Sequence, residues 1–206
     1  MGEKSEIDHL YHDGRRYDQI FAGTEDLAFW SRLAAQQGLR VTGLDNAAAM
    51  LAEAERKAVD VGVHVAWIAA DMRHFALHET FALIILPANT LCHLLTTADV
   101  AACMARVKQH LTPGGRFVID VFVPRMELLV NRSGERFPFA EYADPDGRGS
   151  ITVTESYIYE PHTQIKRITT HQQMPDGTEI AGKLNMRMYF PQELDALLRE
   201  ISRVID

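Results

Sequence analysis

Short apolar runs alternate with helix-like stretches over the first 122 positions of the chain. The strand-like runs lie at 39–44, 63–70, 81–86 and 116–122, and apolar side chains at helical spacing lie between them at 47–59 and 98–111. Another helical pattern covers 25–37, with Thr24 as its N-cap. This rhythm predicts βαβ units, and therefore a Rossmann-like α/β fold with a parallel sheet and helices on both faces.

The pattern changes after Pro124. Residues 131–149 are rich in Gly, Pro, Asp and Arg and predict a loop, and β-rich runs follow at 150–159, 164–174 and 179–190. Pro175-Asp176-Gly177 indicates a turn, so these runs predict an antiparallel β extension. Pro191 fits the first position of a closing helix. We expect a core over 1–130, an antiparallel insertion or lid over 131–190, and a terminal helix over 191–206 that packs on the core.

Composition narrows the class of partner. The formal net charge is −7, which argues against nucleic acid, because a duplex-binding face needs basic residues to neutralise phosphates. A neutral or cationic small molecule meets no such barrier. Two cysteines are too few for a disulfide framework, no apolar run is long enough to cross a bilayer, and residues 1–16 lack an apolar signal core. We therefore expect a cytoplasmic protein without a membrane partner.

Polar residues follow three consecutive predicted strands. Asp45 ends the first, where a carboxylate can accept both hydrogens of a ribose diol. Asp71 and Met72 end the second, and Asn89 lies just past the third. Ligands of open α/β sheets bind beyond the carboxyl ends of the strands, so these positions predict a nucleoside site. Each residue alone is most simply explained as a helix cap or turn former.

Several segments resemble the class I S-adenosylmethionine-dependent methyltransferases, in the branch that acts on small molecules. In chain order they are YDQIFAGTEDLAFW, VTGLDNAAAMLAEAERKA, IAADMRHFAL, FALIILPANTLCHLL, LTPGGRFVIDVFVP and MRMYFPQELDALLRE. The resemblance implies S-adenosyl-L-methionine as the cofactor and methyl transfer to an oxygen or nitrogen of a small molecule. It also implies that the β extension covers the substrate or forms the face of a homodimer.

The resemblance assigns cofactor contacts to seven positions. Asp45 is assigned to the ribose hydroxyls and Asn89 to a place near the methionine moiety. Tyr17 is expected to close over the cofactor from the N-terminal segment. Four residues are expected to frame the adenine, namely Asp71, Met72, Asn46 and Met50.

Two further histidine hypotheses concern catalysis and metal binding. His93 is the candidate general base, although a helix-capping role near the pocket mouth is favoured over it. His74 and His78 lie four residues apart but have no third ligand nearby, so no metal site is expected.

The sequence departs from this family in two places. The family's first strand and glycine-rich cofactor loop should precede Leu39, yet Gln36-Gln37 runs directly into Gly38-Leu39, and the two final strands are missing. Three explanations are open. The gap is a deletion that weakens cofactor binding; or residues 39–44 take the central place, with Gly43-Leu44-Asp45 as a substitute loop; or a partner chain fills it. A catalytically inactive binding or assembly module is the alternative function, and a nicotinamide-dependent oxidoreductase ranks last.

Overall fold

A computed structural model describes residues 11–20 and 40–205, with side chains to residue 200. The chain divides into two compact units. Unit 1 consists of Met1–Asp71, Phe137–Glu155 and Thr169–Lys183, and unit 2 of Met72–Arg136, Ser156–Ile168 and Leu184–Asp206. The helix predicted over 25–37 lies outside the described residues. The three domain boundaries expected from the sequence remain predictions.

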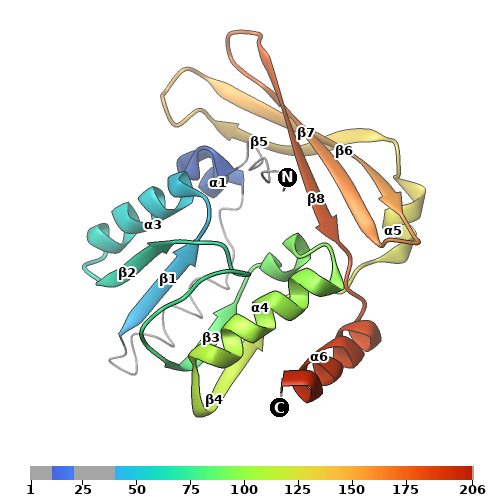
Figure 1. The fold of residues 1–206 in the computed structure, drawn as a ribbon. Helices are drawn as coiled ribbons and strands as arrows, with labels where there is room; N and C mark the ends of the chain where they lie inside the picture. The colour runs from blue at the N-terminus through green and yellow to red at the C-terminus, as the bar shows by residue number, and fades with distance from the viewer. Residues whose placement is uncertain (1–10, 21–39, 206) are drawn as a thin grey trace, which may run out of the picture. The chain divides into compact units, whose positions relative to one another are not determined.

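Unit 1 contains a parallel strand pair with its crossover helix. The elements are α1 (Gly14–Ile20), β1 (Val41–Asp45), α3 (Ala48–Asp60) and β2 (Val65–Ala69). β1 and β2 run parallel, with Val41 opposite Val65 and Asp45 opposite Ala69. α3 packs on both strands, and α1 packs on α3 (Figure 1). The βαβ unit predicted from the hydrophobic pattern is therefore confirmed, whereas α1 was not predicted as a helix.

Gly43 lies in the middle of β1, opposite Trp67. A Cβ atom at position 43 would lie 2.2 Å from Cζ3 of Trp67, so the indole ring occupies the space beside the glycine. Within the described ranges β1 pairs with β2 and has no ladder to β3. The hypothesis that Gly43-Leu44-Asp45 is a substitute loop is therefore wrong, because this segment is strand and holds its place next to β2.

Unit 2 contains the second parallel pair, β3 (Phe81–Leu86) and β4 (Leu111–Ile119). Between them lie the short 3-10 helix η2 (Thr90–His93) and α4 (Thr97–His110); α5 (Met126–Asn131) follows, and α6 (Pro191–Ile205) closes the chain. α4 packs on β4 and on α6 (Figure 1). Pro191 is the first residue of α6, as the sequence predicts.

The boundary of β4 differs from the predicted one. Phe81 pairs with Leu111 but Leu83 pairs with Arg116, so the intervening Pro-Gly-Gly segment forms an irregularity inside the strand rather than a turn before it. Gly114 makes this possible with a φ of +76°, a conformation that glycine adopts readily. The strand consequently ends at Ile119 rather than at Phe122.

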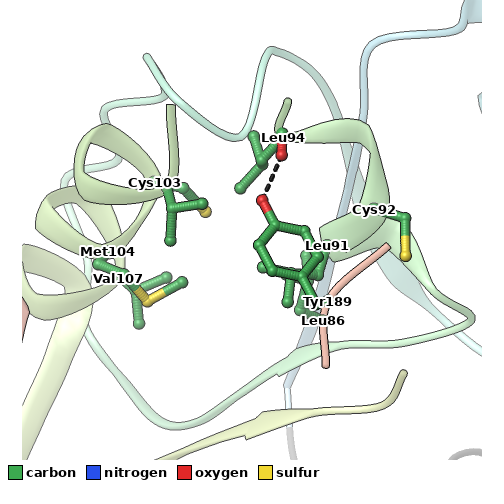
Figure 2. Packing of buried hydrophobic residues seen from close by; sticks show 9 residues of the cluster. Leu86, Leu91, Cys92, Leu94, Cys103, Met104, Val107 and Tyr189 are labelled. Carbon is green, nitrogen blue, oxygen red and sulfur yellow. Dashed lines mark hydrogen bonds between the residues drawn. The ribbon is translucent and has the colours of Figure 1, made fainter. Parts of the chain in front are cut away.

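The core of unit 2 is apolar and closely packed. Leu91, Val100 and Cys92 are completely buried, and Tyr189 is 1% exposed among them. Figure 2 shows the Tyr189 ring inside this cluster, with its hydroxyl donating a hydrogen bond to the carbonyl oxygen of Leu94. The phenol thus fills the core while its polar atom has a partner.

The β extension is a four-stranded antiparallel sheet in the order β5-β6-β7-β8. Its strands are β5 (Arg136–Ala143), β6 (Ser150–Glu160), β7 (Ile165–Gln173) and β8 (Glu179–Arg187), and they contribute residues to both units. The predicted loop over 131–149 is wrong, because it contains β5. Pro138 obscured this strand, yet proline is tolerated there because β5 is an edge strand of the sheet.

Candidate functional site

Asp45 is the last residue of β1, and its carboxylate caps the chain that enters α3. Its Oδ1 accepts a hydrogen bond from the backbone N–H of Ala47 at 2.7 Å. Its Oδ2 makes no hydrogen bond among the residues that the structure describes. The capping bond therefore occupies only one of the two carboxylate oxygens. Asn46, which follows it, is exposed, and Met50 is half-buried on the first part of α3.

The ends of β1 and β2 are tied together. The backbone N–H of Ala70 donates to the carbonyl oxygen of Asp45 at 3.0 Å. Asp71 is the next residue and is half-buried. The structure thus brings Asp45 and Asp71 to one edge of the strand pair, as expected for parallel strands.

One side of helix α1 packs against α3. Gly14 is buried, and a Cβ there would lie 2.5 Å from Cβ of Glu53 and 2.9 Å from the carbonyl oxygen of Ala49. One turn later, Asp18 forms an ion pair with Lys57 of α3. Residues four apart share a helix face, so Gly14 and Asp18 define the side of α1 that contacts α3.

A second side of α1 packs on the antiparallel sheet. Ile20 contacts the buried cluster of Tyr142, Ile151, Val153 and Met174, which lies on the sheet part of unit 1. Arg16 lies one turn before Ile20 and therefore on the same side of the helix. α1 thus joins the α3 side of unit 1 to the sheet.

Tyr17 lies near the carboxylate that ends β1. Burial raises the pKa of the Tyr17 hydroxyl, and the nearby negative charges of Asp45 and Asp18 raise it further. The ring of Tyr11 lies 5.6 Å from that of Tyr17, centroid to centroid. The structure therefore places an aromatic, neutral phenol beside the carboxylate that ends β1. Tyr17, Asp45, Asn46, Met50 and Asp71 all belong to unit 1.

The remaining predicted residues belong to unit 2. Asn89 and the preceding Ala88 both have left-handed backbone conformations, with φ of 61° and 52°. Oδ1 of Asn89 accepts from the N–H of Phe122 at 2.7 Å, which ties the end of β3 to the chain beyond β4. Two such strained residues in succession require strong local support, so Asn89 has a structural task whatever else it contacts.

Met72 and His93 are placed differently from each other. Met72 is half-buried and packs against the apolar core of unit 2. His93 is the last residue of η2 and is half-buried. Their roles at the adenine and as a general base remain predictions, as does the role of Asn89.

Two expectations about other side chains are wrong. The i,i+4 spacing of Glu53 and Lys57 predicts an ion pair on the solvated side of the helix. In the structure Glu53 is instead buried beneath α1 and accepts from Arg56, while Lys57 pairs with Asp18. The alternating pattern of the last β run predicts Arg187 and Tyr189 as an outward-facing pair. Instead Tyr189 is buried in the core, and Arg187 donates to Glu193 of α6 at 2.6 Å. In both cases a distant segment covers the position, which local spacing does not reveal.

Sequence reasoning also missed polar residues on the buried side of the sheet. Glu155, Thr170 and Gln172 are all less than 9% exposed. Each occupies one of the alternate positions of β6 or β7 that are buried. These positions usually carry apolar side chains, so the polar residue type is what hid them.

Other chemistry is limited in the part of the chain that the structure covers. No three His, Cys, Asp or Glu side chains there are grouped to hold a metal ion. Burial raises the pKa of the Cys92 thiol to about 12, so it stays protonated at neutral pH. None of the helices within 11–20 and 40–205 is long and apolar enough to span a membrane.

Comparison with known proteins defines the class of this chain. Residues 26–115 match the family of methyltransferase domains. This match covers less than half of the chain, and it bears out the resemblance to class I S-adenosylmethionine-dependent methyltransferases that the sequence indicates. No curated protein sequence matches the chain at a significant level.

Solved structures share the fold at low identity. The sugar N-methyltransferase KedS8 from Streptoalloteichus is 16% identical, with a TM-score of 0.67 over 98% of this chain and 87% of its own. SAM-bound CalS10, an amino pentose methyltransferase from Micromonospora echinaspora, is 17% identical, with a TM-score of 0.58 over 97% and 91%. An S-adenosylmethionine-dependent methyltransferase from Clostridium acetobutylicum is 17% identical, with a TM-score of 0.63 over 79% of this chain. The chain spans 63% of the length of that last protein. The Rossmann-like α/β fold is confirmed.

The unit 1 residues fit the nucleoside end of S-adenosylmethionine. Asp45 offers an acceptor oxygen that is free of its capping bond, and Tyr17 adds a buried aromatic ring with a neutral hydroxyl. Adenosine presents a diol and a flat apolar base, which carboxylates and aromatic faces recognise. The glycine loop that the family uses near the amino-acid end is missing from the sequence.

Proposed function

We propose that this protein binds S-adenosyl-L-methionine and transfers a methyl group to an oxygen or nitrogen of a small molecule. The observation that carries the proposal is the placement of Tyr17 beside Asp45 at the carboxyl end of β1, in a chain with a methyltransferase domain. The sugar and amino pentose methyltransferases of the same fold support a small, polar acceptor.

In this proposal Asp45 binds the ribose hydroxyls through the oxygen that does not cap α3. Asp71, Met72, Asn46 and Met50 surround the adenine. Tyr17 closes over the cofactor, and Asn89 contacts the methionine moiety. When bound, the sulfonium supplies an electrophilic methyl group, and the chain's own contribution is to align the acceptor with it.

His93 is proposed as the general base that removes a proton from the acceptor. Its half-buried place at the end of η2 supports this role only in part, because a capping role explains the same position. An amine acceptor that is already neutral needs no base. Dimerisation through the β extension is likewise part of the proposal.

A second candidate is a catalytically inactive binding or assembly module of the same fold. The observation that favours it is the missing glycine loop, since that loop gives the close backbone approach and helix N-terminus that normally bind the cofactor. The two candidates differ in whether the cofactor binds at all.

Calorimetric titration of the purified protein with S-adenosylmethionine and S-adenosylhomocysteine separates these candidates. We expect micromolar binding at one site per chain. Asp45→Ala should weaken it by about 10- to 100-fold, because hydrogen bonds to a charged group are lost. Asp60→Ala is the matched control, since Asp60 is an exposed aspartate at the other end of α3. No heat at millimolar ligand from a folded protein would favour the inactive module.

A further inference from the structure

We infer that His110 is a positioning residue that keeps Met72 in place against the adenine of the cofactor. The inference rests on the proposed function, in which Met72 is one of the adenine contacts. His110 is the last residue of α4, and it acts through residues 72–80, which we call the β2–β3 segment. Both α4 and this segment belong to unit 2.

The His110 side chain is buried and uses both of its ring nitrogens. It is 4% exposed, and its Nε2 accepts a hydrogen bond from the backbone N–H of Leu77 at 2.9 Å. Its Nδ1 lies 2.6 Å from the carbonyl oxygen of Arg106, one turn earlier in α4. Because a carbonyl oxygen only accepts, Nδ1 carries the proton and donates it to this bond. The imidazole is therefore neutral and in a single tautomer, and its one acceptor atom is bound to the β2–β3 segment.

The β2–β3 segment contains neither helix nor strand, so its backbone groups have no regular hydrogen-bond ladder of their own. A backbone N–H that is removed from water needs a partner, and for Leu77 that partner is His110. The Phe75 ring also lies 4.7 Å from the imidazole, centroid to centroid. The last residue of α4 therefore holds the segment by one directed bond and one ring contact.

A second contact attaches the same segment to the other end of α4. Arg73 donates to a carboxylate oxygen of Asp99 at 2.8 Å, and Asp99 lies in the first turn of the helix. With a rise of about 1.5 Å per residue, Asp99 and His110 are roughly 16 Å apart along the helix axis. The helix itself is fixed by the core of unit 2, where Val100 is completely buried. The β2–β3 segment is thus attached to a rigid helix at two widely separated points.

Met72 begins this segment and directly precedes Arg73. It is half-buried and packs against the apolar core of unit 2. Side chains that bind a ligand have to be held within about 0.5 Å of the productive geometry by the residues around them. When the Leu77 N–H loses its acceptor, the segment shifts, and Met72 and the preceding Asp71 lose their place at the base. His110 acts through the segment and touches no ligand, so its role is positioning rather than catalysis.

The test compares two ligands that differ only at the base. S-Inosylhomocysteine carries a carbonyl oxygen where S-adenosylhomocysteine carries the amino group of adenine, so a carboxylate cannot accept a hydrogen bond from it there. By calorimetry we expect wild type to bind S-adenosylhomocysteine about 10-fold more tightly. His110→Leu should weaken the binding of S-adenosylhomocysteine by about 10-fold and reduce the preference to near unity, because the segment no longer holds its contacts at the base.

A conservative variant separates positioning from general support of the fold. His110→Gln keeps an oxygen near the place of Nε2 that accepts from the Leu77 N–H, so it should retain most of the preference that His110→Leu loses. His78→Leu is the matched control, because His78 is an exposed histidine of the same segment, and it should leave both affinities unchanged.

Four outcomes would overturn the inference. An unchanged preference in His110→Leu would show that the bond to Leu77 does not position the base contacts, while the adenosine site itself stands. Equal loss of both ligands, with His110→Gln no better than His110→Leu, would show that His110 only supports the fold. Equal binding of the two ligands by wild type would show that the segment does not read the base. If neither ligand binds wild type, the proposed function fails and this inference fails with it.

Discussion

The two units support their strand ends in different ways. In unit 2 the strand ends and η2 rest on apolar side chains, of which Leu91, Val100 and Cys92 are completely buried. In unit 1 no residue of β1 or β2 is classed as buried, and the described contacts of α1 with α3 are a close glycine crossing and an ion pair. Unit 1 also has an apolar cluster, with Ile151 and Val153 completely buried on its part of the sheet. Among the described residues, the contrast with unit 2 therefore lies at β1, β2 and the contact of α1 with α3.

This difference bears on function. Apolar burial is roughly proportional to the area removed from water and tolerates small shifts, whereas ion pairs and glycine crossings depend on position to a fraction of an ångström. The proposed cofactor end therefore lies beside the α1–α3 contact, which small shifts perturb easily. We expect ligand binding to stabilise unit 1 more than unit 2, because a ligand stabilises the state that it binds.

The largest effect is expected in the core of unit 2. Leu91→Ala removes a completely buried side chain and should lower the free energy of unfolding by about 2–5 kcal/mol. Urea unfolding measures the change. Leu128→Ala, at an exposed position of α5, should change stability by less than about 0.5 kcal/mol. A loss below about 1 kcal/mol at Leu91 would show that the unit 2 core is not the main source of stability.

A smaller loss of stability with a larger effect on binding is expected at Gly14. Gly14→Ala places a methyl group 2.5 Å from Cβ of Glu53, which neither helix can accommodate without shifting. Unfolding should become easier by about 1–3 kcal/mol, although alanine itself favours helix. The affinity for S-adenosylhomocysteine should fall because Tyr17 moves with α1.

The control for this change is Gln19→Ala, at an exposed position of the same helix. It should preserve both the stability and the affinity, as measured by urea unfolding and calorimetry. If Gly14→Ala instead stabilises the protein and binds ligand normally, the α1–α3 crossing has no role in the site.

The sequence predicted the elements whose pattern is local. The helix expected at 47–59 is α3, the strand expected at 81–86 is β3, and the helix expected at 98–111 is α4, with boundaries that differ by one residue at most. In each, apolar spacing over several residues agrees with the burial that the tertiary structure imposes. Asp45 was also placed correctly at a strand end.

The elements that were missed depend on contacts made far along the chain. α1 and α5 are one or two turns long and carry too few apolar residues for a periodic signal. β5 contains a proline that only an edge strand tolerates, and the strand order is not visible in the sequence.

The smallest effect on stability is expected for Asp99, whose carboxylate is part of the N-terminal cap of α4 in unit 2. Burial acts to raise the pKa of Asp99, but the hydrogen bonds from Thr96 and the ion pair with Arg73 at 2.8 Å outweigh it, so that the pKa is lowered. The stability from this carboxylate is present above its unfolded pKa of about 3.9 and is lost as the pH falls through the folded value. Asp99→Asn should cost about 1 kcal/mol at pH 7, and the difference from wild type should close as the pH falls below about 4.

Urea unfolding of wild type and Asp99→Asn at several pH values measures this difference, and Asp195→Asn, at an exposed position of α6, is the control. A difference that is constant with pH would show that the side-chain hydrogen bonds of the cap matter and the charge does not. A difference larger than that of Leu91→Ala would show that unit 2 depends more on this charge than on its apolar core. The expected order, with Leu91→Ala above Asp99→Asn, means that apolar burial contributes more than this capping charge to the stability of unit 2.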